Sequence, residues 1–254
     1  MSTSHRDLIL DQFTRQAVPF STAPSIKDEQ ALNLVVEFAG TTANDTVLDV
    51  ACGPGLLLLA FARVARRAVG IDLTPAMLDR ARVLQREKGL TNLDWVRGDG
   101  LVMPFPDGAF SMVTSRFAFH HILDPAAALV EMARVCAPGG RIVVVDSAPA
   151  PDKADAFNRM EVVRDPSHVR AMPLEELRGL FGRARLREPR TTSYRLEGEV
   201  EGLIKRSFPL PGDDETLRRI FAASIERDDL GVNARREAGE IRFGYPVAIL
   251  VADR

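Results

Sequence analysis

The sequence predicts an α/β protein with a doubly wound parallel sheet and a helical cap. Short β-branched or aliphatic runs alternate with helical patterns from residue 46 onward, as in repeated βαβ units whose parallel sheet is covered on both faces. A glycine-rich turn joins the first run to a leucine-rich helical stretch. Two further helical stretches interrupt the alternation and have no place in a minimal sheet. The 254 residues form one predicted domain, 1–254, large enough to bury a substantial core.

The composition indicates a globular chain with no bulk charge prepared for nucleic acid. Hydrophobic residues make up 46%, charged residues 27%, and the formal net charge is -2. The N-terminus carries Asp7 and Asp11 and no apolar core of signal-peptide length, and other apolar runs are too short to span a bilayer. Cys52 and Cys136 match no paired ligand spacing. We therefore expect a cytoplasmic protein with reduced thiols, no metal, no membrane span and no nucleic-acid partner.

The elements follow in chain order. Helical patterns over residues 5–17 and 25–38, separated by the prolines of "VPFSTAPS", predict a flexible helical lid over residues 1–40. The core, residues 41–150, is predicted to contain strands at residues 46–50, 68–72, 93–97, 110–115 and 141–146. An edge strand at residues 190–196 and a last strand at residues 241–252 follow in the prediction.

The helices between the core strands show apolar stripes. These stripes indicate ordinary core packing and comprise Met77, Ala81 and Leu84 after the second strand, and Leu129, Met132 and Cys136 before the fifth. The helix before the fifth strand is expected to end at Pro138, because Gly139 and Gly140 are typical of a helix stop.

Residues 151–172 and 198–236 are predicted to form the cap insertions. Both are helical in pattern, and Asp213 with Asp214 indicates a helix start in the second. The cap should pack over the carboxyl edge of the sheet, where ligands of open α/β folds bind. Its mixture of apolar residues and arginines suits a partly apolar small-molecule substrate and would serve equally well as the contact of a homodimer.

The turn in "VLDVACGPGLLLLAF", Val47 to Phe61, predicts the chemistry of a ligand. Gly53 and Gly55 allow the backbone to approach a ligand closely at a helix start. The third glycine of a dinucleotide fingerprint is missing. Asp49 would repel a pyrophosphate and attract an ammonium group. The ligand is therefore expected to carry a positive charge near this turn.

Two further acids end the next strands. Asp72 lies 72 − 49 = 23 residues after Asp49 and can accept hydrogen bonds from a ribose diol. Asp99 could accept from an exocyclic adenine amine, and apolar surface for the ring is offered by Leu73, Met77 and Leu101. Taken together, these residues predict a ligand with an amine, a ribose and an adenine but no pyrophosphate.

Four ordered motifs then carry a family resemblance: "VLDVACGPG", "GIDLTPAML", "GDGLVMPFPDGAFSMVTSRFAFHHILDP" and "EMARVCAPGGRIVVVD". Residues 46–146 closely resemble class I S-adenosylmethionine-dependent methyltransferases, within them the ubiquinone and menaquinone biosynthesis C-methyltransferases. The resemblance implies a Rossmann-like, seven-stranded, mostly parallel sheet with a reversed last strand. It also implies that Gly53 and Gly55 lie beside the methionine part, Asp72 on the ribose, and Asp99 with the Gly100 backbone at the adenine.

Each acid also has a structural interpretation. Asp49 could cap the following turn, Asp72 could start the next helix, and Asp99 could stabilise a Gly-Asp-Gly turn. The cofactor-binding set that we predict includes these three acids, and the remaining members are Ala51, Gly53, Gly55, Leu73, Met77, Gly98, Gly100, Ser115, Arg116 and Phe117.

Methyl transfer from a sulfonium needs alignment and exclusion of water rather than a catalytic nucleophile. A general base would help with a phenol, acidic carbon or amine acceptor. "SRFAFHHILDP" supplies His120, which we favour as this base, and His121, which we assign to the substrate. Because neighbouring side chains point in different directions, one histidine is expected to be structural, and both could be packing or capping residues.

"RDPSHVR" supplies a second candidate base, His168, and a substrate-binding candidate, Arg164. His168 could instead bond the backbone at the cap hinge. Phe20 is a further substrate-binding candidate, since Phe20 or Phe117 could present an aromatic face to the sulfonium or could simply pack.

The predicted function is S-adenosylmethionine-dependent methyl transfer to a small organic molecule, such as a quinone, phenol or natural-product intermediate. Asp49 and the missing third glycine disfavour a nicotinamide-dependent oxidoreductase. Two alternatives stay open at this point: a cofactor-binding scaffold that transfers nothing, and a repurposed enzyme that uses the sulfonium as a fixed charge.

Overall fold

The computed structural model describes residues 4–254. In this part of the chain, a single sheet has the strand order β3-β2-β1-β4-β5-β8-β6. Five neighbouring strands run parallel: β3 (Leu93–Arg97), β2 (Arg67–Asp72), β1 (Thr46–Val50), β4 (Phe110–Arg116) and β5 (Cys136–Ser147). The long β8 (Glu240–Asp253) is antiparallel to β5 and to β6 (Arg190–Glu199). The mostly parallel sheet with a reversed last strand is thus confirmed.

One short strand was not predicted from the sequence. β7 (Arg235–Glu237) pairs with the start of β8 in a hairpin, which makes the sheet of the described residues eight-stranded. Its charged "RREAGE" sequence lacks the apolar alternation from which strands are recognised.

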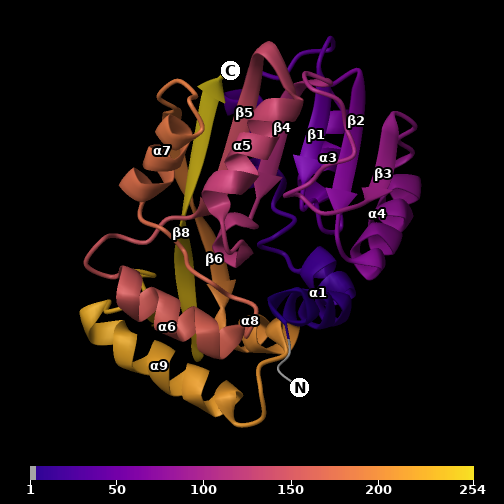
Figure 1. Cartoon of the computed structure of the whole chain (residues 1–254). Coiled ribbons are helices and arrows are strands. Elements are labelled where there is room, and N and C mark those ends of the chain that lie inside the picture. Colours follow the sequence, from indigo (N-terminus) through magenta and orange to yellow (C-terminus); the bar gives the residue numbers. More distant parts are fainter. Residues whose placement is uncertain (1–3) are drawn as a thin grey trace.

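Helices cover both faces of the sheet (Figure 1). Residues of α2 (Glu29–Phe38) and α3 (Leu56–Ala62) share one buried cluster with Val47, whereas residues of α5 (Pro125–Val135) and α7 (Leu174–Arg183) share a second cluster with Leu48. Neighbouring side chains of β1 thus enter opposite layers, as the alternation along a strand requires. α4 (Pro75–Lys88) connects β2 to β3 and buries the predicted stripe of Met77, Ala81 and Leu84.

The N-terminal helices have boundaries that differ from the prediction. α1 (His5–Thr22) begins with a Ser4–Asp7 capping box and continues through Pro19, and α2 starts only at Glu29, after its cap Asp28. Pro19 has no N–H to donate to the carbonyl one turn earlier, and α1 ends within one turn after it, where the Thr22 hydroxyl donates to the carbonyls of Val18 and Pro19.

The end of α5 is a second correction. The helix stops at Val135 and not at Pro138, and β5 already begins at Cys136. Phe110 pairs with Cys136 and Met112 with Arg141, so the register shifts between these pairs. The proline and two glycines form this irregular strand segment, and pairing to β4 has overridden the local helix-stop pattern.

The cap helices lie at the end of the sheet where β1 to β4 finish (Figure 1). They are α6 (Ala154–Arg164), α8 (Val200–Ser207) and α9 (Asp213–Arg227). An aromatic row joins α6 and α9 to β8, because the ring centre of Phe221 lies 5.0 Å from that of Phe243, and the Tyr245 ring lies 4.8 Å from Phe243 and 5.2 Å from Phe157. α1 packs against both α4 of the core and α8 of the cap.

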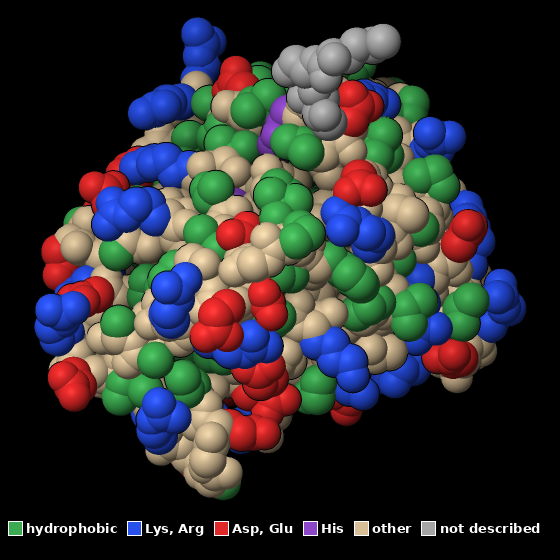
Figure 2. Space-filling view, turned by 90° about the horizontal axis from the view of Figure 1, so that it is seen from below, with side chains coloured by type: hydrophobic (Ala, Val, Ile, Leu, Met, Phe, Trp, Pro, Cys, Tyr) green, Lys and Arg blue, Asp and Glu red, His purple; other side chains and the backbone are tan. Residues whose placement is uncertain are grey.

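Figure 2 views the molecule from the end that carries α1 and α9, and it shows acidic and basic side chains interspersed over this face. Within residues 4–254, no helix combines the length and the apolar character that crossing a bilayer requires.

Candidate functional site

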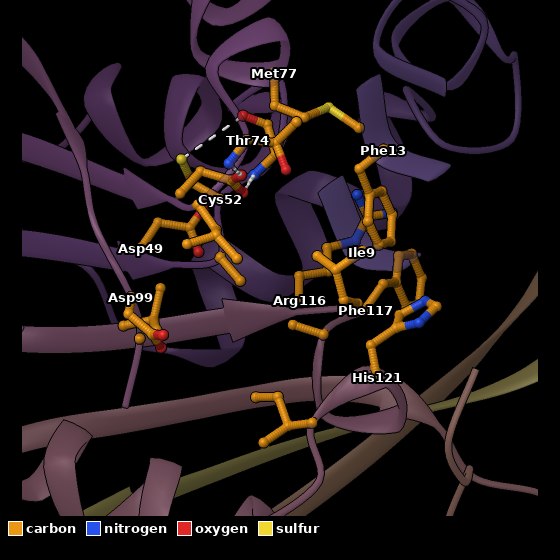
Figure 3. A pocket seen from close by; sticks show the side chains of 18 of the residues that line it. Ile9, Phe13, Asp49, Cys52, Thr74, Met77, Asp99, Arg116, Phe117 and His121 are labelled. Carbon is orange, nitrogen blue, oxygen red and sulfur yellow. Dashed lines mark hydrogen bonds between the residues drawn. The ribbon is translucent and has the colours of Figure 1, made fainter. Parts of the chain in front are cut away.

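A cavity of about 300 Å³ lies between the carboxyl edge of the sheet and the lid helix α1. Figure 3 shows its two sides: Asp49 and Asp99 lie on one, whereas Phe13, Phe117 and His121 gather on the other. The lining includes the ends of β1, β2 and β4, so strand ends far apart in the sequence meet here.

The backbone leaves the sheet through left-handed turns at two of these strand ends. Ala51 (φ 53°) follows β1 and Phe117 (φ 57°) follows β4. Such φ values are unfavourable for residues other than glycine and concentrate at functional sites. Gly53 (φ 53°) adopts the same conformation without strain, and all three residues line the cavity.

Asp49 is a buried carboxylate without a full set of partners. Its side chain is almost fully buried, and Oδ1 has no hydrogen-bond partner among the described residues. Burial raises the pKa of Asp49 well above its usual range, the nearby Arg116 guanidinium lowers it, and Asp72 raises it further. An unpartnered buried carboxylate that lines a cavity is suited to a cationic ligand.

Arg116 complements this acid. Its Nη1 donates to the Ile26 carbonyl at 3.2 Å, and its guanidinium stacks 4.4 Å from the centre of the Phe117 ring. Its Nε and Nη2 are buried and have no partner in the described part of the chain. These two nitrogens form one edge of the guanidinium, which matches a carboxylate in a bidentate manner. Asp49 and Arg116 together could receive the ammonium and carboxylate of an amino acid.

Asp72 holds the glycine-rich turn. Its Oδ2 accepts from the Gly53 amide at 2.7 Å, and its Oδ1 accepts from the Thr74 amide at 2.8 Å. Burial raises the pKa of this carboxyl, and the two amide hydrogen bonds counteract the rise. Since each carboxylate oxygen can accept more than one hydrogen bond, Asp72 can also bind a hydroxyl pair of a ligand.

Asp99 lies at the mouth of the cavity. Its Oδ1 accepts from the Leu101 amide at 3.0 Å, and Arg6 of the lid contacts its Oδ2 at 3.2 Å. Neighbouring Gly98 and Gly100 have little space, because an added Cβ would meet Ile71 or Val50 at 2.7 Å. The chain therefore packs closely against β1 and β2 here.

Thirteen of the predicted site residues line the cavity: Phe20, Asp49, Ala51, Gly53, Asp72, Leu73, Met77, Gly98, Asp99, Gly100, Arg116, Phe117 and His121. Their placement agrees with the predicted site, and their individual roles stay predictions.

Two predicted cofactor residues lie outside the lining. Gly55 (φ 76°) starts α3, and a Cβ there would overlap the Trp95 ring of β3. Helix–sheet packing therefore explains why a glycine occupies this position. Ser115 donates to the Val50 carbonyl at 2.9 Å and so ties β4 to β1 instead of facing a ligand.

The predicted bases and Arg164 also lie outside the lining. His120 Nδ1 hydrogen-bonds to buried Asp146, whose Oδ2 accepts from the Phe119 amide at 2.8 Å. His168 Nε2 bonds the Asn158 side chain at 2.8 Å. The cavity does not reach these groups, so we do not assign the base to either histidine.

Arg164 takes part in a buried ionic network and has no access to the cavity. It contacts Glu161 at 2.7 Å and Asp165 at 3.6 Å. The guanidinium holds the pKa of Glu161 at about 2, against the opposing effect of burial. Its substrate-binding assignment is therefore not supported.

The lid contributes more residues to the lining than the sequence predicts. α1 adds His5, Arg6, Ile9 and Phe13 to the lining, and the segment after β4 adds Ile122 and Leu123. The spacing of Ile9 and Phe13 is one helical turn, which is the signal that could have indicated a cavity-facing stripe.

The chain is similar to known methyltransferases. A family model described as "Methyltransferase domain" matches residues 48–144. "Uncharacterized methyltransferase YcgJ" of Bacillus subtilis is 31% identical over 235 residues, which cover 91% of this chain and 93% of that protein. Its crystal structure has a TM-score of 0.80 at 28% identity and covers 89% of this chain and 98% of that one.

A demethylmenaquinone methyltransferase of Thermus thermophilus is 42% identical over 121 residues, 47% of this chain and 54% of that protein. The chain thus spans about half the length of this second relative.

The chain belongs to the class I S-adenosylmethionine-dependent methyltransferases, and its cofactor is S-adenosylmethionine. More narrowly, it is related to the ubiquinone and menaquinone biosynthesis C-methyltransferases. The cavity fits this cofactor, because Asp49 Oδ1 and the Nε and Nη2 of Arg116 offer unpartnered groups of the charges that an amino acid needs.

Proposed function

We propose that this enzyme transfers a methyl group to a small organic molecule bound beside the aromatic side of the cavity. The donor's amino acid part would contact Asp49 and Arg116, its ribose Asp72, and its adenine the region of Asp99. One observation carries the proposal: Oδ1 of Asp49 and Nε and Nη2 of Arg116 have no hydrogen-bond partner among the described residues, and both residues line the cavity.

The chain's own contribution to this reaction is binding, alignment and exclusion of water. S-adenosylmethionine supplies an activated methyl group when bound. Met77, Leu73 and Thr74 give its nucleoside side a largely apolar wall, and α1 covers the cavity. A largely apolar chamber covered by α1 favours displacement by the acceptor over side reactions with water.

The acceptor side is also apolar. Ile9, Phe13 and Phe20 of α1 face the cavity, as do Phe117, Ile122 and Leu123 from the end of β4 onward. This lining supports an acceptor with an apolar or aromatic body, such as a quinone, a phenol or a natural-product intermediate. The demethylmenaquinone methyltransferase named above supports a quinone-like acceptor over the half of the chain that it matches.

Incubation of the purified protein with methyl-labelled S-adenosylmethionine tests the proposal. Quinol, phenol and amine acceptors are supplied separately, and label transfer and S-adenosylhomocysteine release are measured together. We expect equal amounts of both products with at least one acceptor. Tight donor binding without label transfer to any acceptor would favour the scaffold or the repurposed enzyme.

A further inference from the structure

His121 is a buried histidine that faces the cavity. It ends η1 (Phe119–His121), the short 3-10 turn after β4, and its ring packs edge-on against Phe13 of the lid at 5.0 Å. Figure 3 shows the ring beside Phe13 and Phe117 on the apolar side of the pocket. His121 is thus a titratable side chain placed where the acceptor is proposed to bind.

The partners of Nδ1 determine the tautomer of this ring. Nδ1 lies 3.0 Å from the Ser167 carbonyl oxygen, which can only accept a hydrogen bond. Nδ1 also lies 3.2 Å from Ser167 Oγ, whose own hydrogen is donated to Asp165 Oδ1 at 2.5 Å. Both neighbours therefore require a hydrogen on Nδ1. In the neutral ring, Nε2 then carries the free lone pair.

Nε2 has no hydrogen-bond partner among residues 4–254, and this nitrogen keeps some accessible surface. His121 as a whole is buried and lines the cavity. The edge of the ring that carries the lone pair is therefore the one available to a bound molecule.

A second layer of contacts fixes this orientation. Asp165 accepts from the Ser167 amide at 2.9 Å and from Gln16 of the lid at 3.2 Å. His5, also on the lid, donates from Nε2 to the His121 carbonyl at 2.7 Å. Such outer contacts orient a reactive imidazole in many enzymes. The position of α1 and the orientation of His121 are thereby coupled.

We propose that Nε2 of His121 is the proton acceptor for an O–H or aromatic C–H group of the methyl acceptor, which becomes acidic as the new bond forms; this proposal rests on the proposed function. The acceptor oxygen or carbon forms a bond to the methyl carbon as the sulfur–methyl bond breaks. The sulfur keeps that electron pair, and the proton moves to Nε2. The products are the methylated acceptor, S-adenosylhomocysteine and a protonated His121, which later releases its proton to water.

The environment of the ring supports the restriction to oxygen and carbon. Burial lowers the pKa of His121, the neighbouring His120 acts in the same direction, and the resulting pKa of about 3 leaves the ring neutral at physiological pH. A weak base suffices for a methylated oxonium or an arenium intermediate, which are strongly acidic. A methylated ammonium holds its proton too firmly for such a base.

Two acceptor probes and two variants test this role. The probes are 1-naphthol, which is protonated at neutral pH, and 4-nitro-1-naphthol, which is already ionised there. His121→Asn keeps a donor at the Nδ1 position, whereas His121→Gln places an amide near the Nε2 position. Neither variant can take the proton. We expect kcat with 1-naphthol to fall by roughly 10²–10⁴-fold in both variants.

The comparison between the probes separates catalysis from structure. Turnover of the ionised probe should fall far less, and the dissociation constant of S-adenosylhomocysteine should stay unchanged. His168→Asn is the matched control, because it removes a buried histidine outside the cavity lining and should leave the ratio between the probes unchanged. Equal losses for both probes in the His121 variants would overturn the proposal.

A second measurement needs no turnover. With S-adenosylhomocysteine bound, nitrogen-15 NMR of the His121 ring should show a protonated Nδ1 and an unprotonated Nε2. The assignment comes from the signal that disappears in His121→Gln. A protonated Nε2 with a bare Nδ1 would overturn the proposal even if neither naphthol is methylated. Failure of the proposed function would instead appear as absent S-adenosylhomocysteine binding in calorimetry.

Discussion

At Asp49, the requirements of protein stability and of ligand binding oppose each other. Its carboxyl is buried with one unpartnered oxygen, and burial raises its pKa well above the usual range. In the folded protein, ionisation of Asp49 therefore costs more than in the unfolded chain. As pH rises through the unfolded-state pKa and then the raised folded-state pKa, stability is lost. The ammonium of the donor would offset this cost on binding.

Asp49→Asn should accordingly stabilise the free protein and weaken donor binding. The melting temperature at neutral pH should rise, and the gain should vanish in acid, where the native carboxyl is protonated. S-adenosylhomocysteine binding should weaken by about 1.5–3 kcal/mol, the range for a hydrogen bond to a charged group. Calorimetry and thermal unfolding at two pH values check this prediction. A variant that binds as tightly as the native protein would contradict it.

The acids were predictable from the sequence, whereas the histidines were not. Asp49 and Asp72 end parallel strands, so their meeting at one sheet edge follows from topology. His120 and His121 are neighbours in a single 3-10 turn. Which of the two faces the cavity depends on Asp146 and Ser167, which are distant in sequence. Local pattern contains no information about these partners.

At the scale of elements, the start of α3 combines a turn with close packing. Gly55 has a positive φ, and the Trp95 ring occupies the space where its side chain would be. The sequence predicts that this glycine contacts the ligand. Its true neighbour, Trp95 of β3, is brought close only by the tertiary fold, so the local sequence does not indicate it. Gly53, in the same turn, lines the cavity instead.

Gly55→Ala should therefore destabilise the protein through both backbone strain and overlap, by about 2–5 kcal/mol in denaturant unfolding. Gly89→Ala is the matched control: its φ is 65° at the end of α4, and no atom outside its chain neighbours lies within 4 Å of an added Cβ. That variant should lose only the strain contribution, about 1–2 kcal/mol. Equal losses in the two variants would show that Trp95 packing is irrelevant.

The acidic residues Asp213 and Asp214 correctly predict the start of α9. The start of α2 is predicted too early, because this helix begins only at Glu29, after its cap Asp28. Boundaries that depend on strand pairing are predicted poorly. β5 begins at Cys136 because β4 supplies a partner strand, although the local sequence is typical of a helix stop. The short β7 exists through its pairing with β8.

For the whole molecule, the alternating pattern and the ordered motifs were sufficient to predict the sheet and its covering helices. The buried contacts between the cap, the lid and the core were not predictable. Lid, core and cap meet around three neighbouring histidine rings, with 4.3 Å between His120 and His121 and 5.6 Å between His120 and His168. Burial lowers the pKa of His168 to about 4 and of His121 to about 3.

These two lowered values predict a loss of stability in acid. Between pH 6.5 and about 4, the unfolded chain binds protons that His168 does not bind in the folded protein, so stability falls as pH falls. Burial lowers the pKa of His120, but Asp146 raises it above its usual value, so His120 acts in the opposite direction.

His168→Asn should make this dependence shallower by about 1.4 kcal/mol per pH unit, the contribution of one proton. Urea unfolding of both proteins at a series of pH values within that window measures the difference in slope. Parallel pH dependences would contradict the buried, neutral state of His168.

We propose that Asp49 and Arg116 together bind the amino acid part of the donor. Calorimetry with S-adenosylhomocysteine and with 5′-methylthioadenosine, which lacks that part, tests it directly in the native protein and in Asp49→Asn/Arg116→Met. The native protein should prefer S-adenosylhomocysteine by at least about 10-fold, and the double variant should bind both ligands equally. If the double variant keeps the native preference, these two residues do not bind the amino acid part of the donor.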